Sequence, residues 1–417
     1  IDVDFCFEKR GKIIEYVGRK YGRENVSQII TFGTMAARAV LKDVARVLEF
    51  SFAESDRISK LVPEEIGITL QRAIEEAPGL KEVARESEQH AKLLRNALVL
   101  EGLNRNTGIH AAGVLITPTP LIEHSPLCRS SKGDVTVQFD MRMSEALGLL
   151  KMDFLGLRTL TVIDKALDLV AETTGERLRA EEIPTDDAAT YELLQAGRTV
   201  GIFQLESSGM QELVRKMAPT SWDDITAICA LYRPGPLGAD MDKVYVERKH
   251  GRMRVEYKDP VLEPILKDTY GVILYQEQVM QIASAMGGFS MGQADTLRKA
   301  MGKKKMEMMA EMKVQFLAGA EERGFAGRVA AEIFEEMEFF AQYGFNKSHS
   351  AAYALLSIQT AWLKAHHPAE FMAATMTTEM RKAERITQLI DECKALGLVI
   401  RPPDINLPHP EFGVTAG

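Results

Sequence analysis

Alternation of polar and apolar residues predicts two short strands that lie far apart in the chain. Near the start, Asp2 and Asp4 fall on one face of a strand, and apolar side chains fall on the other. The pattern recurs at residues 149–154, where Lys151 and Asp153 share one face and apolar residues share the opposite one. If these strands pair side by side, their carboxylates gather above a common apolar core.

Helical spacing of apolar residues predicts a short helix at residues 12–20. A longer helix is expected to begin after a turn and N-cap at residues 31–34 and to end near residue 48. Basic residues recur every four positions on the longer helix and form one stripe: Arg38, Lys42 and Arg46. Apolar residues are expected to pack behind the stripe: Val40, Leu41, Val44 and Val47. Such a stripe can follow nucleic-acid phosphates, and it can equally be a solvated helix face.

The rest of the pattern predicts an α+β fold that is mostly helical. Residues 50–108 continue as helices broken at Pro63 and Gly79, and strands are expected at residues 114–116 and 135–139. With the two acidic strands they form a small sheet, so the chain starts in a strand, makes a helical insertion and returns to the same sheet. After the second acidic strand, helices dominate.

Composition limits the class of protein. The length of 417 residues predicts two or three domains, and 46% hydrophobic residues is normal for a folded soluble protein. No apolar run approaches a membrane span and there is no signal sequence, which predicts a cytoplasmic protein without membrane contact. The four cysteines lie far apart, which argues against a zinc site and a disulfide framework. Because the chain begins without Met inside a strand, we expect an interior piece of a longer polypeptide.

Positive charge is clustered although the net charge is −8. One run without acids carries Arg298, Lys299, Lys303, Lys304 and Lys305, and a second group lies at residues 248–254. Local clusters determine nucleic-acid binding more than the total charge does. Runs of cations are also common on solvated helix ends, and the helix dipole favours Arg298 and Lys299 near a helix C-terminus.

The loop at residues 343–350, with the sequence YGFNKSHS, combines aromatic, amide, cationic and imidazole side chains. Ahead of a helix, this composition suits recognition of a phosphorylated or nucleotide ligand. The alternative is an ordinary helix start with Ser348 or Ser350 as the cap. The helix that follows carries a polar stripe: Tyr353, Ser357, Thr360 and Lys364.

The paired acids suit a hard cation such as magnesium, which prefers carboxylate oxygens. A single D-x-D at a strand end is more often a solvated face than a metal site. The second strand strengthens the prediction, because an apolar face behind each acid fixes the direction of its side chain. The sequence therefore predicts a metal site that draws on both strands.

Eight strings of sequence occur in the order found in one known family and cover essentially the whole chain. They are IDVDFC at residues 1–6, SQIITFGTMA at 27–36, HAAGV at 110–114, KMDFLGL at 151–157, FQLES at 203–207, RPGPL at 233–237, AMGKKK at 300–305 and YGFNKSHS at 343–350. Together they resemble the C-family DNA polymerases, the family of the alpha subunit of bacterial DNA polymerase III.

The resemblance implies a palm of nucleotidyltransferase type at residues 1–31 and 110–158, a helical thumb at 32–109, and large helical fingers at 159–417 that are incomplete at the C-terminal end. It implies template-directed DNA synthesis in bacterial chromosome replication, in which dNTPs are added to a primer 3′ hydroxyl. Two magnesium ions would bridge the acids and the triphosphate. The implied ligands are primer-template DNA and dNTPs, and the implied partners are a sliding clamp, a clamp loader and a proofreading exonuclease subunit.

In the family motif P-D-x-D-x-D-F, the metal ligands are the first two acids and the later acid of K-x-D. Asp2 then matches the second acid and Asp153 the third ligand, while Asp4 matches the last acid, which the family does not treat as an essential ligand. The first ligand would immediately precede Ile1, and the glycine-serine turn that holds the triphosphate would lie further upstream. We therefore expect this chain alone to be catalytically silent.

The resemblance also implies contacts with the substrates. Lys151, Arg298 and Lys299 are expected at the triphosphate. The expected nucleotide pocket is formed by Tyr343, Asn346, Lys347 and His349. In that pocket His349 would check the sugar 2′ position by occlusion. Contacts with DNA phosphates are expected from Arg38, Lys42, Arg46, Lys303, Lys304 and Lys305.

Two other classes of function use parts of the same pattern. A metal-dependent nuclease would use the same carboxylates with water as the nucleophile, and it would release nucleotides instead of extending a primer. A non-catalytic nucleic-acid-binding module would bind primed DNA without extending it.

Overall fold

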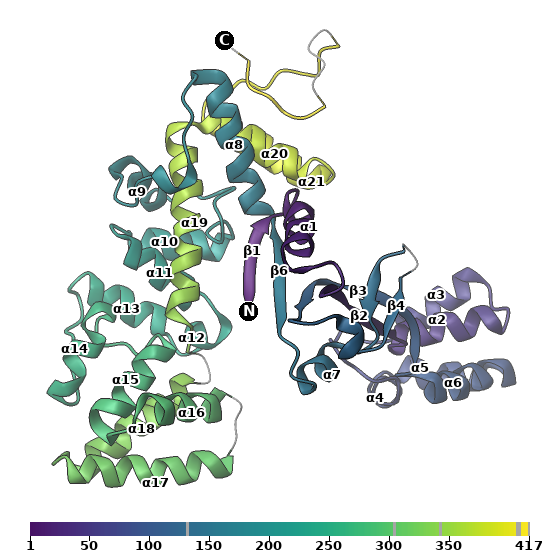
Figure 1. The fold of residues 1–417 in the computed structure, drawn as a ribbon, viewed down its shortest axis with the longest axis horizontal. Coiled ribbons are helices and arrows are strands. Elements are labelled where there is room, and N and C mark those ends of the chain that lie inside the picture. Colours follow the sequence, from purple (N-terminus) through teal and green to yellow (C-terminus); the bar gives the residue numbers. More distant parts are fainter. Residues whose placement is uncertain (131–132, 303–305, 342–343, 406–409, 416–417) are drawn as a thin grey trace. The chain divides into compact units, whose positions relative to one another are not determined.

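The computed structural model describes residues 1–417 except residues 131–132, 303–305, 342–343, 406–409 and 416–417 (Figure 1). The chain divides into two compact units, Ile1–Leu157 and Arg158–Gly417. Across the described residues, no helix is both long enough and apolar enough to cross a membrane.

A mixed sheet, six-stranded within the described residues, forms the centre of the first unit. Its strands are β1 (Asp2–Cys6), β2 (Val26–Thr34), β3 (Asn104–Ile116), β4 (Leu127–Arg129), β5 (Val135–Val137) and β6 (Lys151–Leu157). The order across the sheet is β1-β6-β3-β2-β5-β4. Strand β1 is parallel to β6 and β2 is parallel to β5, while the other neighbours are antiparallel. The predicted return of the chain to one sheet is confirmed.

Apolar clusters lie on both faces of the sheet because successive residues of a strand point in opposite directions. Val114 packs with Val17 of α1 (Arg10–Tyr21). Leu115, the next residue of β3, packs with Ile29 in a separate cluster. A slip of one residue would exchange these faces, so burial on both sides specifies the register of β3, and Phe154 of β6 packs in the same cluster as Val114.

Strand β2 is longer than the sequence pattern predicts. Residues 31–34, predicted as a turn and helix N-cap, form the end of β2 and pair with residues 104–108 of β3. The prediction was wrong because β3 supplies a partner strand, and Thr and Phe favour extended backbone. Helix α2 (Ala37–Val47) follows with Ala36 at its N-cap and ends close to the predicted residue 48.

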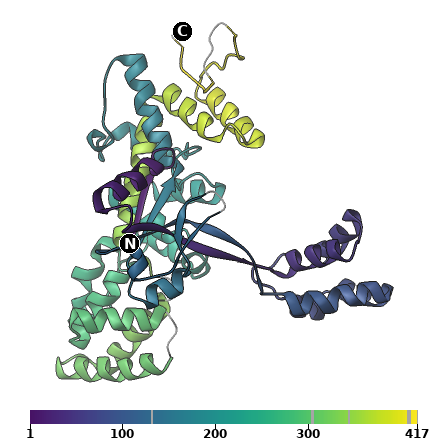
Figure 2. The same cartoon turned by 45° about the vertical axis from the view of Figure 1, so that its right-hand side comes forward.

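Between β2 and β3, where every residue is described, five helices form an insertion with its own apolar core. Besides α2 they are α3 (Phe52–Lys60), α4 (Leu70–Glu76), α5 (Pro78–Glu86) and α6 (Glu88–Leu100). Leu41, Leu70, Leu80 and Leu93 are buried at their centre. Figure 2 shows these helices at the far ends of the long β2 and β3 strands. The predicted thumb, residues 32–109, thus begins within β2 and ends within β3.

Two details of the insertion differ from the sequence prediction. The predicted break at Pro63 lies between α3 and α4 and is confirmed, but Gly79 lies inside α5, which begins at Pro78. Proline is tolerated at the first helical position because an N–H there has no intrahelical acceptor. Val47, predicted to face the core, is 73% exposed, since α2 ends there and Leu48 packs against the core instead.

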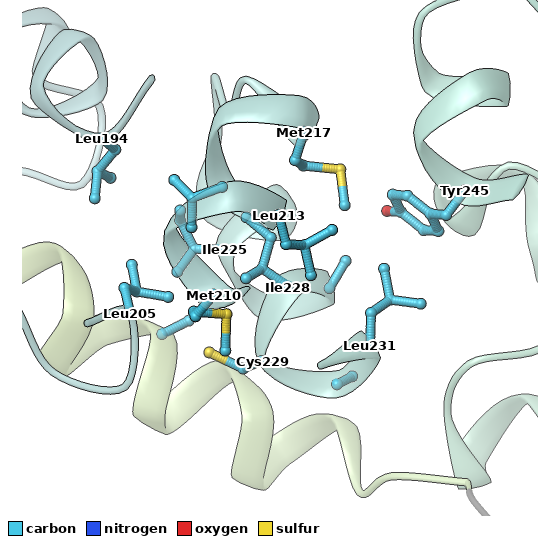
Figure 3. Close-up of a cluster of buried hydrophobic side chains, with 14 of the residues drawn as sticks. Leu194, Leu205, Met210, Leu213, Met217, Ile225, Ile228, Cys229, Leu231 and Tyr245 are labelled. Carbon is cyan, nitrogen blue, oxygen red and sulfur yellow. The ribbon is translucent and has the colours of Figure 1, made fainter. Parts of the chain in front are cut away.

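The second unit is almost entirely helical, which completes the predicted α+β, mostly helical fold. Its helices are α8 (Arg158–Thr174), α9 (Ala188–Gln195), α10 (Ser208–Met217), α11 (Trp222–Leu231), α12 (Pro234–Gly238), α13 (Met241–Lys249), α14 (Glu263–Leu266), α15 (Gln276–Gly287), α16 (Met291–Gly302), α17 (Met306–Glu322), α18 (Gly327–Ala341), α19 (Lys347–His366), α20 (Pro368–Glu379) and α21 (Ala383–Ala395). Figure 3 shows part of one core, where Leu213, Ile225 and Ile228 pack between α10 and α11. A second core lies between the four helices α15, α16, α17 and α18, around Phe316 and Phe334.

Helix α19 runs through the second unit beside α8, α9, α11 and α20 (Figure 1). Three members of its predicted polar stripe are therefore buried: Ser357, Thr360 and Lys364. Ser357 Oγ donates to the Phe203 carbonyl at 2.9 Å, and the Phe203 N–H donates to Thr360 Oγ1 at 3.2 Å. These three side chains bond the backbone of a neighbouring loop and do not form a solvated or ligand-facing surface.

Candidate active site

Asp2 and Asp153 are direct register partners on the parallel strands β1 and β6. The Asp153 N–H donates to the Ile1 carbonyl at 2.7 Å, and the Ile1 amino group donates to the Lys151 carbonyl at 3.3 Å. Asp4, two residues along β1, lies opposite Leu155. The predicted pairing of the two acidic strands is confirmed, and it sets Asp2 rather than Asp4 across from Asp153.

Lys151 and Asp153 form a partly buried ion pair. Lys151 Nζ donates to Asp153 Oδ2 at 2.7 Å, and the two side chains are 14% and 13% exposed. Burial raises the pKa of Asp153, but the hydrogen bond and positive charge of Lys151 outweigh it and hold that pKa below its usual range. The carboxylate is therefore ionised at neutral pH, as a metal ligand must be.

The second carboxylate oxygen of Asp153 supports a metal site. Asp153 Oδ1 is buried and accepts no hydrogen bond from the described residues. A buried, unpaired carboxylate oxygen is costly unless another group binds it. Asp2, exposed on the adjacent strand, supplies further oxygen at the same register position. These donors fit a hard divalent cation such as Mg²⁺.

Two residues beside the acids were not predicted from the sequence. His110 Nδ1 accepts hydrogen bonds from the N–H groups of Ala112 and Gly113 at 3.1 and 2.6 Å, and Gly113 is the register partner of Asp153 on β3. Arg10 of α1 donates through Nε to the Phe154 carbonyl at 2.5 Å. Its Nη2 also donates to the Ala111 carbonyl of β3. The only sequence signal for these roles was the HAAG string, which gave no position relative to Asp153.

The predicted nucleotide loop meets the start of α19. Asn346 is the N-cap, and its Oδ1 accepts from the His349 N–H at 2.7 Å, so neither predicted serine cap is correct. The Glu277 carboxylate accepts from the Lys347 N–H at 3.0 Å and from Asn346 Nδ2 at 3.0 Å. Because the first-turn N–H groups of Lys347 and His349 are engaged, a phosphate would meet side chains here rather than this helix end.

Aromatic rings surround the exposed side chains of this loop. The His349 ring lies 5.3 Å from the Phe345 ring and 4.2 Å from the Tyr353 ring, both edge-on. Lys347 Nζ lies 5.5 Å from the centre of the Tyr275 ring. Tyr343 lies outside the described residues.

On α16, Arg298 and Lys299 share one acidic partner. Arg298 donates through Nε and Nη2 to Asp295 Oδ1 at 3.0 and 2.7 Å, and Lys299 Nζ lies 2.6 Å from Asp295 Oδ2. Arg298 Nη1 also donates to Gln276 Oε1 at 3.0 Å. Gln276 Nε2 also donates to the Gly344 carbonyl at 3.0 Å, so this side chain connects Arg298 with the predicted nucleotide loop. Lys303, Lys304 and Lys305 lie outside the described residues.

Comparison with known proteins identifies the family. Residues 1–156 match the family model described as the bacterial DNA polymerase III alpha NTPase domain, and residues 159–324 match the bacterial DNA polymerase III alpha subunit finger domain. The chain is 51% identical over 415 residues to DNA polymerase III subunit alpha of Vibrio cholerae and 50% identical over 424 residues to that of Pseudomonas aeruginosa. The chain belongs to the bacterial DNA polymerase III alpha subunit family.

The relation to these alpha subunits extends over nearly the whole chain but only part of each relative. The alignments cover 97% of the chain for Vibrio cholerae and Escherichia coli and 99% for Pseudomonas aeruginosa. The same alignments span 36% of the length of each relative.

In this member of the alpha subunit family, the basic stripe of α2 is paired with acids. Arg38 Nη1 lies 3.4 Å from Glu64, Lys42 Nζ lies 3.0 Å from Asp56, and Arg46 Nη2 lies 3.4 Å from Asp43. All three basic side chains are between 43% and 73% exposed. Exposed pairs of this kind are weak, so DNA phosphates can compete with the carboxylates.

The same insertion holds a second cluster with metal-ligand chemistry. Within the described residues, Glu54, Glu86 and His90 bring their ligand atoms within 4.8 Å of one another. Arg57 Nη2 bonds both carboxylates at 2.6 Å, and with His90 it lowers the pKa of Glu54 to about 2. One guanidinium already bonds both acids, so the cluster is a charge network that joins α3, α5 and α6.

Proposed function

We propose that this chain forms the polymerase region of a template-directed DNA polymerase that adds dNTPs to a primer 3′ hydroxyl in bacterial chromosome replication. The observation that carries the proposal is the pairing of Asp2 with Asp153, which places two carboxylates at one register position. One oxygen of this pair, the buried Asp153 Oδ1, accepts no hydrogen bond from the described residues. Family membership supports the same reaction, since its relatives are DNA polymerase III alpha subunits.

Asp2 and Asp153 are proposed as ligands of two magnesium ions. When bound, magnesium supplies activation of the primer hydroxyl and neutralisation of the leaving pyrophosphate. Lys151 Nζ donates a hydrogen bond to Asp153 Oδ2 and so fixes the orientation of the carboxylate. From the family resemblance, we also propose that the Lys151 ammonium contacts the triphosphate. Asp4 is proposed as a neighbour without an essential role.

In the second unit, the nucleotide contacts proposed among the described residues are Arg298, Lys299, Asn346, Lys347 and His349. Arginine and lysine would contact the triphosphate, and His349, flanked by two rings, would test the sugar 2′ position. Tyr343 is kept as a proposed pocket residue on the resemblance alone.

DNA binding is proposed along the insertion and the fingers. Arg38, Lys42 and Arg46 would exchange their carboxylate partners for DNA phosphates, and the resemblance adds Lys303, Lys304 and Lys305. This contribution is independent of sequence and weakens as salt rises. The proposed domains are a palm at residues 1–31 and 110–158, a thumb at 32–109 and fingers at 159–417.

The whole protein's partners are also proposals, because the chain spans 36% of its relatives' length. A sliding clamp, a clamp loader and a proofreading exonuclease subunit are proposed from the family. A cytoplasmic location is proposed with them.

The test distinguishes synthesis from cleavage. A polypeptide of the relatives' full length that contains this sequence is mixed with a labelled primer on a template, Mg²⁺ and one dNTP at a time. The proposal expects a primer longer by one nucleotide only with the complementary dNTP. A shortened primer would indicate a nuclease, and an unchanged primer that is bound to the protein would indicate a binding module; either result would overturn the proposal.

A further inference from the structure

Gln276 connects the two parts of the second unit that are proposed to contact the nucleotide. It is the first residue of α15, and its side chain lies between α16 and the loop before α19. Its Oε1 accepts from Arg298 Nη1 at 3.0 Å, and its Nε2 donates to the Gly344 carbonyl at 3.0 Å. One side chain therefore contacts both the basic helix and the predicted nucleotide loop.

The chemistry of the two neighbours suits an amide at this position. A guanidinium only donates hydrogen bonds and a carbonyl only accepts them, so the bridging group must accept at one end and donate at the other. If the amide were rotated by half a turn, its NH2 group would face the Arg298 guanidinium and its oxygen would face the Gly344 carbonyl, and neither pair could form a hydrogen bond. The two partners therefore determine which end of the amide is Oε1 and which is Nε2. A carboxylate or an aliphatic side chain could not make both contacts.

The loop is fastened to Gln276 and its neighbour by further contacts. The Gln276 N–H donates to the Phe345 carbonyl at 2.9 Å, and the Phe345 N–H donates to the Leu274 carbonyl at 3.3 Å. At Gly344, an added Cβ would lie 3.3 Å from Gln276 Cγ, so the glycine permits this close packing. Glu277 continues the attachment through Asn346 and Lys347.

Arg298 is oriented from two sides. Among the described residues, its contacts with Asp295 and Gln276 use three of the five N–H groups of a guanidinium. The side chain is 27% exposed, so part of it reaches solvent. Asp295 fixes Arg298 only within α16, whereas Gln276 fixes it relative to the loop.

We propose that Gln276 is a positioning residue that sets the Arg298 guanidinium relative to residues 344–349, the end of the loop and the first turn of α19, so that a dNTP held by these residues meets Arg298 through its triphosphate. The inference rests on the proposed function. Without the amide, Arg298 keeps Asp295 but loses its fixed distance from the loop. Nucleotide binding then weakens, while the metal site of the first unit keeps its own contacts.

The test is a double-mutant cycle on the full-length enzyme, with KM for dNTP and kcat measured by primer extension. Gln276→Ala is expected to raise KM about tenfold, the effect of one hydrogen bond to a charged group, and to change kcat less than about twofold. Arg298→Ala is expected to raise KM at least as much. Adding Gln276→Ala to Arg298→Ala is expected to change KM less than about twofold, because Gln276 acts through Arg298.

Gln281→Ala is the matched control, because Gln281 is an exposed glutamine on the same helix, and it should leave KM unchanged. If Gln276→Ala does not fold, Gln276→Met keeps the length of the side chain and removes both polar contacts. An unchanged KM in a folded Gln276 variant, or full additivity with Arg298→Ala, would overturn the inference. If Asp153→Asn kept full activity, the proposed function would fail instead, so the two failures are distinguishable.

Discussion

Asp2 and Asp153 face each other across two parallel strands whose residues are separated in the chain by the whole helical insertion. Phe5 of β1 and Phe154 of β6 pack in one apolar cluster with their ring centres 5.3 Å apart, so a slip of one residue would remove an aromatic ring from that cluster. The insertion can therefore vary or move while the two carboxylates keep their relative position.

Helices α15 and α17 pack so closely at Gly319 that a larger residue there would destabilise the second unit. A Cβ at Gly319 of α17 would lie 2.0 Å from the Gly287 carbonyl oxygen of α15, a backbone atom that cannot move alone. We expect Gly319→Ala to destabilise the chain by about 2–3 kcal/mol, because the helices must separate.

The matched control for that change is Gly292→Ala in α16, where an added Cβ meets no atom within 4 Å. It should be neutral or stabilise by up to about 1 kcal/mol. Chemical denaturation followed by circular dichroism measures both variants. Equal stability of the two variants would contradict the packing described for α15 and α17.

Lys364 is a structural cation inside the second unit. Its side chain is fully buried, and Nζ donates to the carbonyls of Arg198 and Val200 at 2.8 and 2.7 Å and to Glu392 Oε1 at 2.7 Å. We expect Lys364→Met to cost about 3 kcal/mol of unfolding free energy, because it leaves Glu392 and two carbonyls unpaired.

Lys382→Met provides the comparison, since Lys382 is 59% exposed and pairs with Glu379 at the surface. Its effect should stay below about 1 kcal/mol. Denaturant unfolding of both variants gives the two values. A Lys364→Met variant as stable as the original chain would show that the buried bonds do not stabilise this unit.

The charge network of the insertion predicts a pH dependence. Arg57 and His90 lower the pKa of Glu54 to about 2, below its ordinary value of 4.5. A lowered folded pKa gives stability that is fully present above the unfolded pKa and is lost as pH falls through the folded one. The stability difference between the original chain and Glu54→Gln should therefore be constant above about pH 5 and shrink as pH falls toward 2.

Denaturant unfolding at several pH values between 3 and 7 measures that difference. Glu82→Gln is a suitable control, because Glu82 is 64% exposed and pairs with Arg85, three residues further along the same helix. A difference for Glu54→Gln that grows on acidification would have the wrong sign for this network.

Local patterns predicted the elements of the fold, but not the contacts between them. The acidic strands and their side-by-side placement followed from alternation over five residues, but the register that puts Asp2 opposite Asp153 did not. The end of β2 was predicted wrongly because residues 31–34 become extended only through pairing with β3, which lies some seventy residues further on.

The candidate site shows the same division between local and long-range information. Asn346, Lys347 and Arg298 stood out by residue type, whereas Gln276 and Glu277 gave no signal, because their roles depend on α16 and α19 folding against α15. Lys364 illustrates the opposite error: its spacing predicted a polar face, and only the packing around α19 shows that this face is buried.

The central claim is that Asp2 and Asp153, and not Asp4, hold the catalytic metal ions. Its most direct test is Mg²⁺-dependent primer extension by the full-length protein carrying Asp2→Asn, Asp153→Asn or Asp4→Asn. We predict that extension falls at least about a thousandfold in the first two variants and less than about tenfold in the third, since only the first two remove ligands. Full activity of Asp2→Asn or Asp153→Asn, or an equal loss in Asp4→Asn, would contradict the account.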